Sequence, residues 1–330
     1  MLTSFAKSLF HSLLTVVFIV LLSKSAGAAS FVSGDTQEDA TDPSFFLKKG
    51  QFSETTFYRY GATTADNYNY LGIKTGDFSQ NEQNINQALA YGVTDRFMVT
   101  VNDTYNPTDI TKVTSMSGTT TDRSSSGFTD PVITGKYRVV VQNPSFISWD
   151  IFTGYSPNIF SAEAPSPTQD GTVARGSQSE FFGMDINHNY RKLTLQGVAQ
   201  ATYNGTASTL NLSNNDYSST DAHWSYLVGI NTQRRFSDNF NINLNVDYTF
   251  NDSENGRNTL EHAYTSAANN SGDFEAALNY QAIQNLWVSL VYDYYLYSNT
   301  SQKYADYPTS DTSVKDKCQN QIGLKAQYIF

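Results

Sequence analysis

Two side chains near residue 224 have the spacing of a serine nucleophile and its general base. His223 and Ser225 flank Trp224, and a histidine close to a serine can activate the hydroxyl for attack on an ester bond. Residues two apart in a β-strand share a face, so both side chains could reach one substrate. The pair indicates a hydrolase as one hypothesis for this chain.

The surroundings of this pair favour a different interpretation. Outer-membrane phospholipases carry a His-x-Ser on a strand and orient the histidine with a downstream asparagine. Here Asn231 is too close and Asn239 lies beyond the next turn. The alternation of neighbouring residues also predicts that His223 and Ser225 share the polar face of their strand, whereas a phospholipase needs its nucleophile on the lipid-facing side. We interpret the pair as polar wall residues and keep a lipid-modifying enzyme as the alternative.

No other arrangement of titratable residues points to catalysis. The histidines are scattered, the single cysteine is Cys318, and the sequence contains no zinc-binding, HExxH or phosphate-cradling glycine motif. One cysteine cannot form a disulfide framework. The sequence therefore predicts neither an enzyme nor a bound metal or cofactor.

Charged side chains recur on the strand faces that also carry asparagine, glutamine and threonine. In a channel such side chains set selectivity, and alternatively they pair with one another and brace a polar interior. The sequence leaves both hypotheses open. The candidates to line an interior are the bases Arg96, Lys136, Arg138 and Lys325 and the acids Asp150, Asp185, Asp247, Glu275 and Asp293.

The elements that would position these residues begin with an export signal. Lys7 precedes the apolar run 13–22, and Ala26-Gly27-Ala28 supplies small residues for cleavage, which predicts a signal peptide over 1–28. The run is about half of the roughly 20 apolar residues that a membrane-spanning helix needs. Residues 29–50 are predicted to form a periplasmic or lumen-plugging segment before the first strand.

Short and long polar stretches alternate along the rest of the chain. The short breaks recur about every 46 to 50 residues, and roughly ten strand-like residues flank each of them. The breaks are 94–95, 142–144, 191–192, 237–239 and 284–285. The long stretches, rich in loop-forming residues, are 62–82, 105–127, 156–176, 204–222, 251–270 and 298–317.

This asymmetry is typical of outer-membrane barrels, which have short periplasmic turns and long external loops. We predict an all-β, antiparallel up-and-down transmembrane β-barrel of about 12 strands over residues 51–330. The expected strands are 51–61, 83–92, 96–104, 128–141, 146–155, 177–190, 193–203, 223–236, 240–250, 271–282, 286–297 and 318–330.

The predicted strand 240–250 shows the clearest alternation. Phe240, Leu244 and Val246 fall on one face, and Asn245 and Asp247 fall on the other, as expected for a wall between lipid and water. The faces of strand 51–61 cannot be assigned from the sequence. A soluble β-sandwich also alternates, but aromatic residues border the short breaks, which predicts an interfacial girdle. These aromatic residues are Tyr91, Phe97, Phe146, Tyr190, Phe236, Phe240, Tyr280 and Trp287.

Two segments carry a resemblance to a known family. Residues 91–96 (Tyr-Gly-Val-Thr-Asp-Arg) and 127–138, which begin Gly-Phe-Thr-Asp-Pro, resemble motifs of the outer-membrane transporter-like proteins named for the meta-pathway of phenol degradation. Thr129 departs from the pattern, in which a second glycine is expected. The resemblance implies a transporter of small molecules, including aromatic or hydrophobic ones.

The functional expectation is passive uptake or efflux of small molecules through the outer membrane of a Gram-negative cell. Twelve strands would leave a pore narrower than that of the 16- to 18-stranded porins. A structural or adhesive surface barrel is a further alternative. The expected partners are membrane lipid, lipopolysaccharide, a small-molecule solute and the barrel-assembly machinery, which would recognise the terminal Phe330. The formal net charge of −10 argues against nucleic acid as a partner.

Overall fold

The computed structural model describes residues 40–141, 147–166, 168–258, 260 and 262–330. The predicted signal peptide 1–28 and Phe146 lie outside the described residues. Within the described part of the chain, no helix has the length and apolar character required to cross a membrane.

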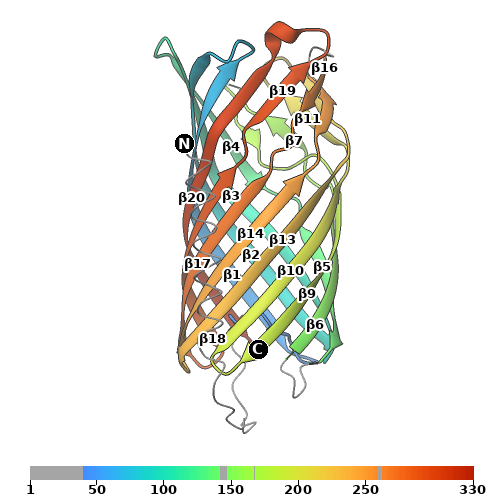
Figure 1. The fold of residues 1–330 in the computed structure, drawn as a ribbon, viewed down its shortest axis with the longest axis vertical. Coiled ribbons are helices and arrows are strands. Elements are labelled where there is room, and N and C mark those ends of the chain that lie inside the picture. Colours follow the sequence, from blue (N-terminus) through green and yellow to red (C-terminus); the bar gives the residue numbers. More distant parts are fainter. Residues whose placement is uncertain (1–39, 142–146, 167, 259, 261) are drawn as a thin grey trace. The chain divides into compact units, whose positions relative to one another are not determined.

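Twelve antiparallel strands form one closed ring (Figure 1), which confirms the predicted fold class. Each strand pairs with the next in the ring, and the last pairs with the first, from Ser53 opposite Ile329 to Asn69 opposite Thr312. The ring strands are β1 (Phe52–Asn69), β2 (Lys74–Thr94), β3 (Phe97–Ser115), β5 (Val132–Val140), β6 (Ile147–Ser156), β9 (Ser179–Tyr190), β10 (Leu193–Asn204), β13 (His223–Ser237), β14 (Phe240–Asn251), β17 (Ser271–Ile283), β18 (Leu286–Tyr297) and β20 (Thr312–Ile329).

The two ends of the barrel differ. At the short-turn end, pairs of turn residues at 95–96, 191–192, 238–239 and 284–285 join the strands, at breaks that the sequence predicts. At the long-loop end, short extra strands and a 3₁₀ turn at Pro308–Ser310 continue the wall above the ring. These strands are β4 (Thr120–Phe128), β7 (Ala162–Ala164), β8 (Gly171–Thr172), β11 (Ala207–Asn211), β12 (Asp216–Thr220), β15 (Glu254–Arg257), β16 (Ala263–Ser266) and β19 (Thr300–Tyr304).

The long polar stretches are therefore not the irregular loops that the sequence indicates. Residues 62–82 are mostly the outer halves of β1 and β2, and 105–127 are mostly β3 and β4. These strand portions are polar on both faces, so they lack the apolar alternation that identifies a lipid-facing strand. These portions still pair as strands, because backbone hydrogen bonds between strands do not require apolar side chains on one face.

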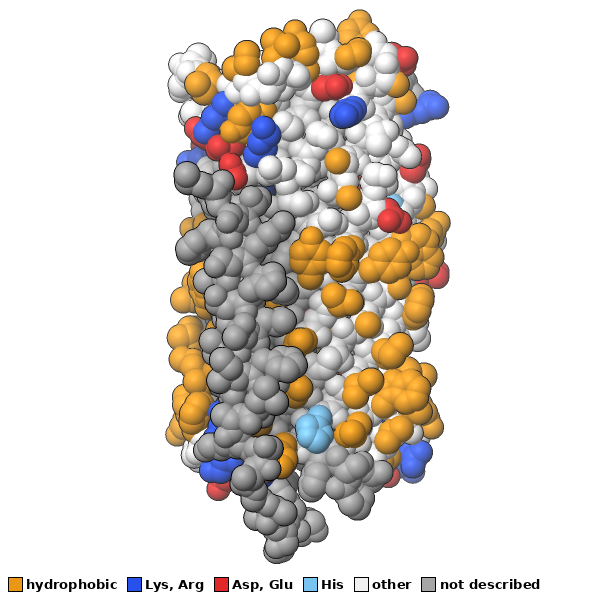
Figure 2. All heavy atoms as spheres, viewed as in Figure 1, with side chains coloured by type: hydrophobic (Ala, Val, Ile, Leu, Met, Phe, Trp, Pro, Cys, Tyr) orange, Lys and Arg blue, Asp and Glu red, His pale blue; other side chains and the backbone are white. Residues whose placement is uncertain are grey.

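The predicted register of β14 is confirmed. Leu244 is 36% exposed on the outer face, whereas Asn241 is fully buried on the inner face. In Figure 2, hydrophobic side chains spread over the barrel wall, and most charged side chains lie towards its two ends. An apolar wall with polar ends is the surface that a bilayer requires of a transmembrane barrel.

The structure assigns the faces of β1 and corrects the expectation for Trp287. The ambiguous strand β1 turns Ser53 and Phe57 into the barrel and Tyr58 and Tyr60 outward. Trp287, expected in the interfacial girdle, is only 2% exposed and lies inside. Its neighbours Leu286 and Val288 occupy the outer positions on β18, so alternation excludes Trp287 from the lipid-facing wall.

The orientation predicted from the sequence can be tested at two turns. We expect a short epitope tag at Asn214, in the β11–β12 turn of the long-loop end, to be detected on intact cells. A tag at Asp238, in the β13–β14 turn, is expected to be detected only after the outer membrane is opened. Antibody labelling before and after permeabilisation measures both, and the reverse pattern would refute the predicted orientation.

Candidate functional site: the barrel interior

Four charged residues of three neighbouring strands meet on the inner wall towards the short-turn end. Lys136 Nζ lies 3.2 Å from Asp150 Oδ2 and 2.8 Å from Asp185 Oδ2. Arg138 Nε and Nη2 donate to the two oxygens of Asp150 at 2.8 and 3.0 Å. The pairing follows from the register, which places Arg138 and Asp185 on either side of Asp150. We call these residues the paired cluster, because two bases meet two acids.

A second group lies on β14, β17 and β18, and it is dominated by acids. Asp247 is directly opposite Asp273, and Glu275 is directly opposite Asp293. We call these four residues the acidic cluster. Arg59 reaches it from β1, with Nε 3.3 Å from Asp293 Oδ2 and Nη2 3.9 Å from Glu275 Oε2.

The reach of Arg59 depends on a glycine in the intervening strand. Gly323 on β20 pairs with Arg59 on one side and with Val291 on the other. A Cβ at Gly323 would lie 2.6 Å from the Phe57 ring and 3.1 Å from Arg59 Cγ. The absent side chain lets the arginine cross β20, because any larger residue would occupy the same space.

The structure brings together most of the predicted candidates and separates one. Lys325 lies half-buried on β20, directly opposite Ser289, and its charge acts on Asp293 of the acidic cluster. Arg96 differs from the expectation, because it is exposed in the β2–β3 turn. Asp273 was missed, although it stands two residues before Glu275 and so shares its face.

Residues 40–47 also lie among the inner side chains near the short-turn end, and no pattern in the sequence indicates which residues they contact. Thr41, Phe46 and Leu47 are buried. Asp42 accepts a hydrogen bond from Thr194 Oγ1 at 2.8 Å, and Ser44 O accepts one from Arg138 Nη2 at 2.8 Å.

His223 and Ser225 occupy inner positions on β13, and Trp224 is exposed on the outside, as the register predicts. His223 Nε2 lies 3.4 Å from Glu254 Oε1, and Asn204 Nδ2 is 3.5 Å from Ser225 Oγ. The described residues show no hydrogen bond between the histidine and the serine. Nor do they include a group of three or more acidic, histidine or cysteine residues placed to hold a metal ion.

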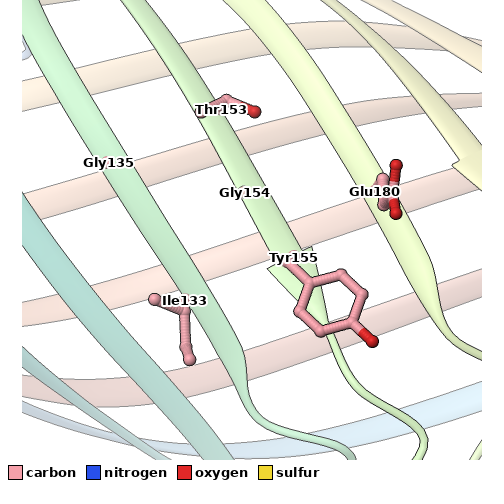
Figure 3. Close-up of a pocket in the computed structure, with 6 residues that line it drawn as sticks. All are labelled: Ile133, Gly135, Thr153, Gly154, Tyr155 and Glu180. Carbon is pink, nitrogen blue, oxygen red and sulfur yellow. The ribbon is translucent and has the colours of Figure 1, made fainter.

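A hollow of about 370 Å³ lies on the wall of β5, β6 and β9 (Figure 3). Ile133 and Tyr155 at its edge are exposed outer-face residues, and Gly135 contributes no side chain to fill it. The hollow therefore opens on the outer surface and is separate from the interior site.

Comparison with known proteins shows similarity of fold and none of sequence family. No family model matches the sequence, and no curated protein matches it. An outer membrane channel from Pseudomonas putida F1 is similar over 91% of this chain and 100% of that one, with 11% identity and a TM-score of 0.57. The chain has the fold of outer-membrane β-barrels. The transport unit of the autotransporter AIDA-I from Escherichia coli is also similar, with 12% identity over 87% of this chain and 92% of that one and a TM-score of 0.51.

Proposed function

We propose that the chain is an outer-membrane channel for passive movement of small solutes. The observation that carries the proposal is the charged interior of a closed ring whose outer wall is apolar. Charged side chains in a barrel of this kind serve selectivity when they are not all neutralised by partners. The paired cluster is balanced, whereas the acidic cluster sets four carboxyl groups against two bases, Arg59 and Lys325.

The acidic cluster supports a preference for cations. Oxygen atoms of Asp247, Asp273 and Asp293 are buried without a hydrogen-bond partner among the described residues. Such oxygens are acceptors, so a solute that carries donors or positive charge would satisfy them. Rings of acidic side chains favour cations in other channels by the same electrostatics.

Aromatic rings lie beside interior charges. The Arg59 guanidinium stands 4.0 Å from the centroid of Phe57, and Lys317 Nζ stands 4.3 Å from that of Tyr297. A ring face attracts a cation, and these two faces are already occupied by cations of the protein. The preference for a cationic solute therefore rests on the acidic cluster. We propose small organic cations, including aromatic ones, as the favoured solute class, in agreement with the aromatic solutes that the family resemblance implies.

Planar-bilayer recording of the refolded protein tests this proposal. Under a potassium chloride gradient, the reversal potential is expected to show cation selectivity, and benzylammonium is expected to reduce the current more than benzoate does. Glu275→Gln combined with Asp247→Asn is expected to weaken the selectivity, because it removes two carboxylates. Glu180→Gln, a change on the exposed outer face of β9, is the matched control. Absence of conductance in the parent protein and in all of its variants would refute the channel, and anion selectivity would refute the cation preference.

A further inference from the structure

We propose that residues 40–48 are a plug that closes the barrel interior near the short-turn end and must leave before solute passes. The proposal rests on the channel function and adds a gate to it. Its basis is the set of contacts that these residues make with the inner wall.

One side of the segment is held by amide side chains of β13 and β14. Gln233 Nε2 and Asn241 Nδ2 donate to Thr41 Oγ1 at 3.0 and 2.9 Å. Asn243 Nδ2 donates to Thr41 O at 2.6 Å. Gln233 and Asn241 are both buried, and both donate to the segment.

The next residues contact β5, β9 and β10. Gln196 Nε2 donates to Pro43 O at 2.9 Å, and Asn189 Nδ2 donates to Ser44 Oγ at 3.0 Å. Arg138, which belongs to the paired cluster, donates to Ser44 O and also stacks on Phe46 with its guanidinium 4.5 Å from the ring centroid.

The end of the segment packs on the remaining part of the ring. Leu47 is completely buried and clusters with Ala40, Trp287 on β18 and Ile329 on β20. Ala90 on β2 packs against the same cluster. This contact explains why Trp287 faces inward: the segment supplies its apolar surroundings.

These contacts run round the ring. The strands touched are β2, β5, β9, β10, β13, β14, β18 and β20. A segment of a few residues that meets so many strands of one closed ring has to cross its interior. Most contacts between the segment and the wall are hydrogen bonds. When the segment moves out, water can replace each of these bonds.

Residues 91–96, one of the two segments that carry the family resemblance, hold the chain where it leaves the plug and enters β1. Gly50 N donates to Gly92 O at 2.8 Å, and Gly92 N donates to Gln51 O at 2.9 Å. Lys49 N donates to Asp95 Oδ1 at 3.0 Å. A Cβ at Gly92 would collide with Lys48 O, so glycine is needed for this close approach. The plug is therefore tethered at one side by residues 49–51 and can swing without detaching.

Two opposite changes test the plug, each in a Cys318→Ser background. Gln196→Ala with Asn241→Ala removes contacts to Pro43 and Thr41. It should shift the closed–open equilibrium roughly 5- to 150-fold towards open, since each hydrogen bond contributes about 0.5–1.5 kcal/mol. Single-channel recording should show a higher open probability. Thr41→Cys with Asn241→Cys should lock the plug when oxidised and release it when reduced.

A second readout does not depend on ion current. Ser289→Cys places a thiol on a buried inner position of β18, two residues beyond Trp287. A membrane-impermeant maleimide is expected to label this thiol faster in the Gln196→Ala/Asn241→Ala protein. Gln87→Ala, on the exposed outer face of β2, is the control and should change neither readout.

The outcomes separate the plug from the channel. A gel shift between unheated and boiled samples establishes that each variant is folded. A folded Gln196→Ala/Asn241→Ala protein with the open probability and labelling rate of the parent overturns the plug. If no protein conducts, the channel proposal fails, and the labelling rate alone then decides whether residues 40–48 block the interior.

Discussion

Replacing Leu244 with arginine is expected to destabilise the membrane-embedded barrel by roughly 2–4 kcal/mol, the cost of placing arginine against lipid near the midplane. Leu244 lies on the outer face of β14, opposite Thr232 on one side and Ala276 on the other. Urea titration of the protein refolded into vesicles measures the free energy of unfolding. The gel shift between unheated and boiled samples reports how much protein has folded.

The neighbouring residue provides the matched control. Asn245 lies on the inner face, so Asn245→Arg should destabilise much less and should shift ion selectivity towards anions. A slip of one residue would exchange the two results, because it moves every side chain to the opposite face. Equal tolerance of both substitutions would show that β14 is not a lipid-facing wall.

Asp150→Ala is expected to cost roughly 3–5 kcal/mol, the usual penalty for removing one partner of a buried ion pair. The Asp150 side chain is fully buried and receives both Arg138 and Lys136. Its loss leaves the Arg138 guanidinium without a carboxylate. The same urea titration measures the change, and Glu180→Ala on the exposed face provides an acid-to-alanine control.

Removing both partners should cost less than removing one. Arg138→Met with Asp150→Leu leaves no uncompensated charge at this position, and Lys136 keeps its 2.8 Å contact with Asp185. The double variant is therefore expected to be more stable than Asp150→Ala. Additive losses in the double-mutant cycle, with Arg138→Met and Asp150→Leu as its single variants, would mean that the pair is not coupled.

The ring could be predicted from the sequence wherever one strand face meets lipid. Alternation at Phe240 to Phe250 defined the register of β14, and turn residues at 191–192 and 284–285 marked the hairpin ends. Strand β1 was ambiguous because its outer positions include Tyr58 and Tyr60, which carry polar hydroxyl groups. The strand portions in 62–82 and 105–127 were missed because both of their faces are polar, so no period of two separates them from loops.

The interior could be predicted only in part. The alternation shows which side chains point into the barrel, but it does not show which of them pair with one another. Arg138, Asp150 and Asp185 were recognised as inward residues, but their meeting depends on the register between β5, β6 and β9. Trp287 was misassigned because aromatic residues near turns are common at membrane interfaces. Its true environment is created by Leu47, which is distant in the sequence.

The seam between β1 and β20 has a consequence for how the barrel is made. Most ring contacts join strands that are close in sequence, but Ser53 pairs with Ile329 and so closes a loop of nearly the whole chain. Such non-local pairing raises the contact order and slows folding, because loop-closure entropy is lost before the pairing is gained. Until β20 arrives, β1 presents an open strand edge that can pair with another chain. Pairing of β20 with β1, rather than formation of any hairpin before it, therefore sets the moment at which the open edge of β1 is removed.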